Sequence, residues 1–463
     1  MKKFAFLAVL LLSNSIFAQQ QPCNCNQVFE KLAAKIETEY PGFEYKTKDR
    51  ATYTAFKESL AKETEMTTGD ACSKLLKKYT DYFKDPHMWV SSSATSGTSG
   101  TDTPANSIVI DIQDFKKKIQ STKDKYEGIW SNENYTFGIK KTSEKEYTGF
   151  VIEAKSNLWK PKDIKFKLFS NDEFEYALLD RTLQNGTYQL YDEGILFLAG
   201  VNVSLVKQTP KPAVPAKQIK EKLQELEGFY CKRISPKTSL VKFPSFEYHH
   251  LKVIDSLIEN NRPLLEQSEN LIVDLRGNPG GTTEAYQKLL PYISGKAIRH
   301  FGAEYLATQT YIDNLEAYKK TLAKDTPTEG IDNQIKKLEE NLGKFVNFNP
   351  SEKPEIITLA VKSPKNVIVL ADKGTGSSAE YFLIIAKQSK KVKIFGNPSY
   401  GALDYGNAYM IDFGCKDYQL LMPTYRALRL PDYPIDYIGI QPDMYIDKAV
   451  KDWVAFAVQY LED

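Results

Sequence analysis

The chain has 463 residues, enough for two or three domains with a large buried core. Hydrophobic residues make up 42% of it and charged residues 26%, which is typical of soluble globular proteins and excludes a disordered or fibrous chain. The net charge of +2 excludes an electrostatic argument for binding nucleic acid or an anionic membrane surface.

The first residues are typical of a cleaved export signal. Met1-Lys2-Lys3 is basic, residues 4–12 are apolar, and Ser15-Ile16-Phe17-Ala18 provides a cleavage site before Gln19. The apolar run is too short to span a bilayer, and no later stretch is long enough. We therefore expect a signal peptide over 1–18 and an exported protein without membrane insertion, periplasmic or secreted.

Five cysteines remain after that cleavage: Cys23, Cys25, Cys72, Cys231 and Cys415. In an oxidising compartment, either Cys23 or Cys25 can pair with Cys72. The odd number leaves at least one thiol free or bonded to another chain. No second Cys/His pair has the spacing of zinc ligands, so we expect no metal.

Residues 19–90 are predicted to form a helical subdomain. Val28, Leu32, Ile36 and Tyr40 recur at helical spacing, and residues 71–83 follow the same pattern. A tract rich in Ser, Thr and Gly follows at 91–105, which predicts a linker with a short helix over 91–123.

Residues 124–207 are predicted to form a small antiparallel β barrel or sandwich. Short aromatic strands recur there at intervals of roughly ten residues. They lie at 126–130, 135–139, 147–152, 164–169, 174–179, 186–191 and 195–199. A linker with three prolines, 208–217, closes this domain.

Residues 218–463 alternate between strands and helices, which predicts an α/β core with a mixed sheet. The expected strands lie at 239–243, 271–275, 366–371, 391–395, 407–413 and 417–422, and the expected helices at 248–260, 282–293 and 378–389. Residues 303–345 are charged and mostly helical, as in an insertion.

Two loops of this core contain residues that suit a catalytic site. In LIVDLRGNPGG (271–281), the adjacent Gly280 and Gly281 let the backbone turn its N–H groups toward a developing oxyanion. In GTGSSAE (374–380), a serine stands where a buried strand gives way to a helix, as a nucleophile on a tight turn does. Together the loops predict a serine hydrolase.

The ordered motifs LIVDLRGNPGG, GTGSSAE, IFGNPSYGA and GIQPD resemble those of carboxy-terminal processing (tail-specific) serine peptidases, serine peptidase family 41, over roughly 239–445. The resemblance implies a ClpP/crotonase-like core with an N-terminal helical subdomain, peptide or protein substrates, and no cofactor. It implies that Ser377, three residues before Glu380, is the nucleophile. The Ser378 amide and that of Gly280 or Gly281 then hold the oxyanion.

The sequence departs from the Ser–Lys branch of that family, because Ala402 follows Gly401 where those enzymes have lysine. Lys373 is one alternative base. A second branch, resembling the tricorn core protease, uses Ser, His and an acid, and His87 and Asp436 match its positions. In that chemistry a neutral imidazole takes the serine proton while a carboxylate holds its tautomer.

Other residues near these motifs have expected supporting roles. Asp274 and Arg276 organise the glycine loop, and Asn278 belongs to the same loop. Asp404 and Tyr405 lie where the lysine is absent and are candidates for substrate contact or for positioning the base. Nothing in 107–207 resembles the peptide-binding loop of the PDZ domain that the family usually carries, so the β domain is expected in its place.

The sequence thus predicts an exported serine endopeptidase or processing peptidase that works through an acyl-enzyme on Ser377. A catalytically inactive ligand- or peptide-binding protein on the same core, and a serine esterase of small substrates, remain alternatives. Cleavage specificity and oligomeric state stay open.

Overall fold

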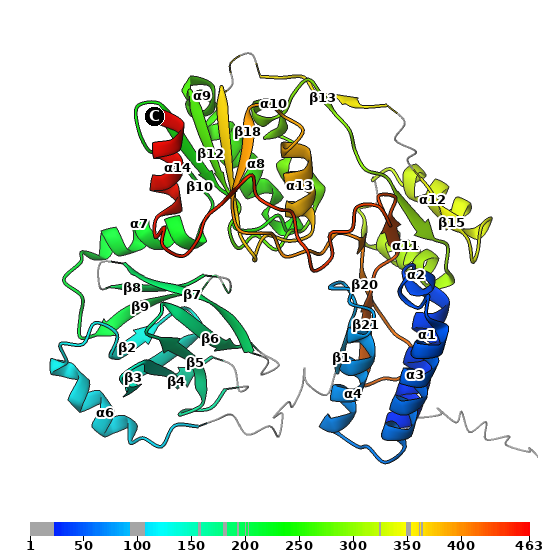
Figure 1. Ribbon diagram of the computed structural model, residues 1–463, viewed down its shortest axis with the longest axis horizontal. Coiled ribbons are helices and arrows are strands. Elements are labelled where there is room, and N and C mark those ends of the chain that lie inside the picture. Colours follow the sequence, from blue (N-terminus) through cyan, green and yellow to red (C-terminus); the bar gives the residue numbers. More distant parts are fainter. Residues whose placement is uncertain are drawn as a thin grey trace, which may run out of the picture.

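The computed structural model describes residues 23–92, 107–155, 159–178, 183–191, 194–199, 201, 203–323, 326–348, 353–360, 362 and 364–463. The expected signal peptide and most of the 91–105 tract lie outside these ranges. Figure 1 shows an α/β core with a β barrel and a helical block at two separate places beside it. No helix among the described residues combines the length and apolarity needed to cross a membrane.

The N-terminal block consists of α1 (Cys25–Glu39), α2 (Phe43–Lys46), α3 (Arg50–Glu65) and α4 (Asp70–Asp81). Its apolar faces share one core with the hairpin of β20 (Tyr409–Ile411) and β21 (Tyr418–Met422). The helical spacing noted for α1 does mark its buried face. The helices end before the predicted limit, because β1 (Trp89–Ser92) pairs antiparallel with β21.

Eight antiparallel strands close into a barrel, because β2 pairs with both β3 and β9. The strands are β2 (Gly128–Ser131), β3 (Tyr135–Ser143), β4 (Glu146–Ala154), β5 (Ile164–Phe169), β6 (Glu173–Ala177), β7 (Leu183–Tyr191), β8 (Ile195–Leu198) and β9 (Val203–Thr209). The sequence missed β9 as a separate strand. Before the barrel, α6 (Ile112–Lys118) and η1 (Ile119–Ser121) pack on its outside through a small apolar cluster.

The core is a mixed six-stranded sheet in the order β10-β11-β12-β17-β18-β23. The strands are β10 (Tyr230–Arg233), β11 (Thr238–Lys242), β12 (Asn270–Asp274), β17 (Asn366–Ala371), β18 (Val392–Gly396) and β23 (Met444–Tyr445). Only β10 runs antiparallel to its neighbour. The buried strands read as continuous apolar runs because both faces are covered.

One face of this sheet packs against α8 (Leu251–Asn260), α9 (Arg262–Gln267) and α13 (Ser378–Ala386). The other face packs against α14 (Trp453–Glu462). Helix α7 (Ala216–Glu227) follows the barrel and precedes the core in the chain. It contacts β8 and β9 and so joins the barrel to the core.

Two expectations for the core were wrong in detail. The helix predicted over 282–293 is broken into η3 (Thr283–Tyr286) and α10 (Leu290–Ile293), since Pro291 is tolerated in a first helical turn but not in the middle of a long helix. The 303–345 segment is mostly helical, as expected, but it begins and ends with short strands that were not predicted. Its helices α11 (Gln309–Thr321) and α12 (Glu329–Glu339) lie between two strands of a small sheet.

That small sheet has the order β15-β14-β22-β19. Strands β14 (Ala303–Leu306) and β15 (Phe345–Val346) flank the two helices, and β22 (Tyr425–Ala427) and β19 (Tyr405–Gly406) come from the end of the core. A separate pair joins β13 (Ala297–Ile298) to β16 (Glu355–Ile356). The insertion is therefore hydrogen-bonded to the segment that follows Asp404.

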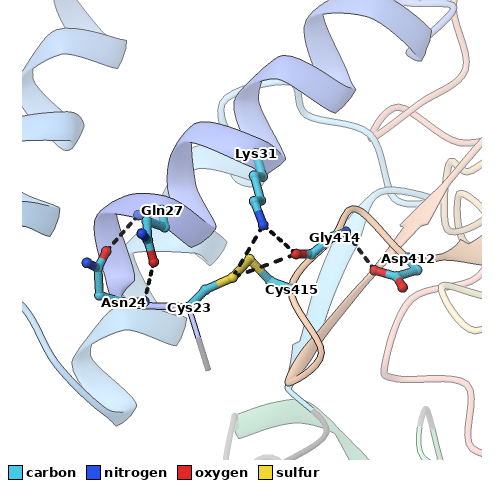
Figure 2. Close-up of a disulfide and its surroundings, with 7 residues drawn as sticks. All are labelled: Cys23, Asn24, Gln27, Lys31, Asp412, Gly414 and Cys415. Carbon is cyan, nitrogen blue, oxygen red and sulfur yellow. Dashed lines mark hydrogen bonds between the residues drawn. A yellow bond between two sulfur atoms is a disulfide. The ribbon is translucent and has the colours of Figure 1, made fainter. Parts of the chain in front are cut away.

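Two disulfides tie the helical block together. Cys25 bonds to Cys72, which settles the alternative left open by the sequence, and Cys23 bonds to Cys415 of the core. In Figure 2 the Lys31 ammonium lies over this second bond and donates to the Gly414 carbonyl at 2.6 Å. Among the described cysteines, Cys231 is free.

Candidate active site

The turn after β17, residues 372–377 (the serine turn), holds Ser377 in a backbone conformation that side chains rarely adopt. Its φ and ψ are 53° and −120°. Such a residue stores about 1–3 kcal/mol of strain, which persists only where the surroundings enforce it. Nucleophilic serines on strand-to-helix turns are held in this strained way. The Ser377 N–H donates to the Glu380 carboxylate at 2.9 Å.

The glycine-rich loop after β12, residues 276–281 (the glycine loop), lies directly against Ser377. A methyl group on Gly280 would come within 2.8 Å of both the Ser377 Cβ and the Ser378 nitrogen, so this approach requires glycine. The Gly280 N–H is occupied, because it donates to Asn278 Oδ1 at 2.9 Å. The amides of Gly281 and Ser378 donate to no acceptor among the described residues.

Polar side chains fix the two loops to each other. Asn278 is buried and donates from Nδ2 to the Phe243 carbonyl at 2.9 Å. Asp372 Oδ1 accepts from the Gly277 N–H at 2.8 Å and from the Gly374 N–H at 2.9 Å. Asp372 therefore joins the glycine loop to the serine turn by hydrogen bonds.

Arg276 makes a bidentate pair with the buried Asp274, from Nε at 2.9 Å and from Nη2 at 2.7 Å. Burial alone would raise the pKa of Asp274, but the charges of Arg276 and Lys242 outweigh it and hold that pKa well below its usual range. Arg276 also lines a cavity of about 230 Å³ between the core and the barrel. These contacts fix the start of the glycine loop.

The carboxylate of Glu380, in the first turn of α13, joins the serine turn to the loop after β18. Besides Ser377, it accepts from the Ser399 hydroxyl and from the amides of Gly401 and Ala402, the last two at 2.7 and 2.8 Å. Ala402 thus contributes its backbone where the Ser–Lys branch has a lysine. Lys373 is exposed on the serine turn.

His87 lies in a buried cluster at the end of the helical block. The Asp85 carboxylate accepts from the backbone N–H of His87 and from the Tyr40 hydroxyl, both at 2.8 Å. His87 Nδ1 is buried and has no hydrogen-bond partner among the described residues. Burial raises the pKa of Asp85, while the nearby His87 opposes the rise.

Asp436 belongs to the same cluster. Its Oδ1 accepts from the amides of Leu403 and Asp404, both at 2.8 Å, whereas its buried Oδ2 has no partner within the described chain. Burial, followed by the negative charges of Asp85 and Asp404, raises the pKa of Asp436 to about 8. Asp85, which lies two residues before His87, is thus close enough to Asp436 for the two carboxyl groups to interact electrostatically.

Asp404 and Tyr405 are buried beneath this cluster. Asp404 pairs with Arg429 at 2.5 Å and accepts from the Ile435 amide at 2.8 Å. The Tyr405 ring lies 5.4 Å from that of Tyr40, so it links the helical block to the core. Asp404 thus holds Asp436 and its loop in place, whereas Tyr405 packs against the helical block, and both are buried.

Sequence reasoning used Glu380 only to number the serine and overlooked its role as an acceptor. The signal was present, because a glutamate three residues after a serine is a capping-box pattern at a helix start. The pairing of Tyr40 with Asp85 had no comparable local signal.

Residues 237–446 match the sequence profile described as Peptidase family S41. The chain carries a serine peptidase domain of family S41. This confirms the resemblance drawn from the four motifs. No curated protein matches the chain.

Solved structures of this peptidase fold resemble the chain along most of its length. Mature CPAF complexed with lactacystin aligns with a TM-score of 0.50 and 12% identity, over 91% of this chain and 93% of that one. A putative peptidase from Parabacteroides merdae aligns at 0.42 and 12%, over 95% and 98%. The photosystem II D1 C-terminal processing protease aligns at 0.41 and 12%, over 92% and 94%. At 12% identity, the likeness to CPAF concerns the fold alone.

Proposed function

We propose that this chain is an exported serine endopeptidase or processing peptidase that hydrolyses peptide bonds through an acyl-enzyme on Ser377. The observation that carries the proposal is the strained Ser377, packed against Gly280 beside two unoccupied amide donors. Strain of this kind in a family S41 domain favours a working nucleophile over a helix cap.

In the first step, Ser377 Oγ attacks the carbonyl carbon of the scissile bond, and His87 takes the hydroxyl proton. The negative charge that develops on the carbonyl oxygen is held by the amides of Gly281 and Ser378. Gly280 contributes the close approach, since its own N–H is bound to Asn278.

In the second step, His87 returns the proton to the leaving amine, and water then hydrolyses the ester on Ser377. Asp436 supports His87 from the buried cluster that they share. Its unpartnered Oδ2 and the unpartnered Nδ1 of His87 are the two atoms that such support would join. Lys373, exposed on the serine turn, is the alternative base.

In this proposal each domain has its own role. The ClpP/crotonase-like core over 218–463 carries the nucleophile, with 303–345 inserted in it, and the helical subdomain over 19–90 supplies the base. The barrel over 124–207, between linkers at 91–123 and 208–217, takes the place of a PDZ domain. The segment 1–18 directs export and is removed.

Labelling with a fluorophosphonate, which reacts with activated serines, tests the proposal. Purified mature chain should be labelled, and Ser377→Ala and His87→Ala should each abolish labelling. Ser378→Ala is the matched control, because it removes a neighbouring hydroxyl but leaves the backbone amide. Labelling retained in His87→Ala but lost in Lys373→Ala would make Lys373 the base.

Turnover separates the enzyme classes. The proposal expects labelled protein to cleave unfolded polypeptides, with every product lost in Ser377→Ala. Cleavage of small esters alone would favour an esterase. A folded wild-type protein that is neither labelled nor active would favour a binding protein and contradict the proposal.

A further inference from the structure

Tyr400 lies directly beside the serine turn. Its N–H donates to the Thr375 carbonyl at 2.8 Å. A methyl group on Gly376, the residue before Ser377, would lie 3.5 Å from the Tyr400 Cβ, which is ordinary contact distance. The Tyr400 side chain nevertheless remains 55% exposed.

A second loop places two more large apolar side chains next to Tyr400. The Tyr437 N–H donates to the Gly401 carbonyl at 2.9 Å, and a methyl group on Gly439 would overlap the Ser399 carbonyl. The backbones of 399–401 and 437–439 are thus in close contact. Tyr437 and Ile438 are 64% and 53% exposed.

Tyr437 is strained in a way that packing in the interior does not explain. Its φ is +62°, a conformation that is uncommon for any residue other than glycine and unusual for a bulky one. An exposed aromatic ring held at such a φ is an observed outlier of the kind that gathers at ligand-binding sites.

Tyr400 and Tyr437 lie close enough to act on each other electrostatically, and the exposed Ile438 follows Tyr437 in the same loop, so exposed apolar residues gather beside the serine turn. Asp81, Asp85 and Asp436 all lie close enough to act on the Tyr437 hydroxyl electrostatically. An apolar group bound here would therefore gain by burying apolar area, while the nearby carboxyl groups offer no positive partner to a negatively charged one.

We propose that Tyr400, Tyr437 and Ile438 form an apolar shelf that binds a large aromatic or aliphatic side chain of the polypeptide substrate near the scissile bond. The inference rests on the proposed peptidase activity and adds a substrate class to it. An acidic side chain at the same substrate position gains no apolar burial and finds no positive partner in Asp81 or Asp85.

The experiment uses the mature full-length chain and starts by locating its cleavage sites in unfolded polypeptides by mass spectrometry. Peptides are then made that differ at one position flanking the cleaved bond, carrying Phe, Leu, Ala or Asp. The shelf predicts that kcat/KM for Phe and Leu exceeds that for Ala by about ten- to hundredfold at one such position. The Asp peptide should be the poorest.

Variants then assign that preference to the shelf. Tyr437→Asn removes the ring with a residue that tolerates positive φ, and Tyr400→Ala and Ile438→Ser remove the other two side chains. Each should reduce the Phe-to-Ala ratio, and the Tyr400/Tyr437 pair should bring it close to one. Tyr248→Ala is the matched control, since Tyr248 is also an exposed tyrosine (70%) but lies in η2 (Tyr248–His250), just before α8.

Cleavage without any apolar preference in the wild type would overturn the shelf and leave the peptidase intact, and needs no variant to fold. A preference that survives in folded Tyr437→Asn and Tyr400→Ala would also overturn it. Absence of all Ser377-dependent cleavage would instead overturn the proposed function, and the shelf with it.

Discussion

Asp436 and Asp85 are two buried carboxyl groups that act on each other electrostatically, and burial together with this interaction makes the protonation of Asp436 depend on folding. Folded Asp436 keeps its proton up to about pH 8, whereas an unperturbed aspartate loses it near 3.8. Between those values the folded state binds more protons than the unfolded state, so stability falls as pH rises, and above about 8 it levels off. A buried charge there opposes folding, whereas the proposed mechanism requires it.

We predict that Asp436→Asn separates these two effects. The amide oxygen can still accept from Leu403 and Asp404, and the variant cannot ionise, so its melting temperature relative to wild type should rise from pH 5 to pH 9. Activity should fall by roughly 10²-fold or more, the typical size of an acid–base contribution.

The pH dependence of kcat/KM provides the contradicting outcome. If the ionised carboxylate supports His87, wild-type kcat/KM should rise with pH up to about 8, and Asp436→Asn should lack that rise. If kcat/KM of the variant rose with pH as it does in the wild type, the titration would belong to another group and Asp436 would have a structural role.

Between elements, the first turn of α13 and the loop after β18 are joined by one side chain. Glu380 is fully buried and accepts four hydrogen bonds, from Ser377, Ser399, Gly401 and Ala402. Glu380→Ala would leave these donors without an acceptor, at about 1–3 kcal/mol each. We predict a loss of at least about 3 kcal/mol, seen as a lower midpoint in urea unfolding.

Two variants control this prediction. Glu380→Gln retains one acceptor oxygen, so it should lose less stability than Glu380→Ala. Glu284→Ala also removes a glutamate from a first helical turn, but Glu284 is exposed, and its cost should stay within about 0.5 kcal/mol. Equal losses for Glu380→Ala and Glu284→Ala would contradict the network.

The same elements show what sequence can and cannot predict. The barrel strands other than β9, and α1, were predicted because alternation and helical spacing are local patterns. Ser377 and Gly280 were proposed as site residues because they stand in ordered motifs. The break before α10 was overlooked although Pro291 signals it. The Cys23–Cys415 bond has a sequence separation of 392, and the Glu380 network depends on a loop about twenty residues away, so neither has a local signature.

At the scale of the whole molecule, the two disulfides hold the helical block, which carries His87, to the core and to itself. In the chain-entropy account each such bond contributes about 2–4 kcal/mol by restricting the unfolded chain. We predict that Cys23→Ser/Cys415→Ser and Cys25→Ser/Cys72→Ser each lower the melting temperature. A reducing agent should destabilise the wild type but not the variant lacking all four cysteines. Cys231→Ser should respond to reduction as wild type does.

The barrel has an apolar interior separate from that of the core, which leads to a final prediction. Closure of β2 against β9 leaves it no free sheet edge, and its interior is an apolar cluster of its own around Trp130, Phe137 and Phe166. The ion pairs Lys451–Asp172 and Lys448–Glu173 join it to the core, and such exposed pairs contribute at most about 1 kcal/mol each.

A fragment of residues 107–209 should therefore fold alone, unfold cooperatively in urea, and keep Trp130 and Trp159 in an apolar environment as judged by tryptophan fluorescence. A fragment of residues 107–201 is the matched control, because it lacks β9 and leaves β2 and β8 with open edges; it should bind a hydrophobic dye and lose cooperativity. If the longer fragment behaved like the shorter one, the barrel would depend on α7 and the core for its stability, and the two would have to be regarded as one folding unit.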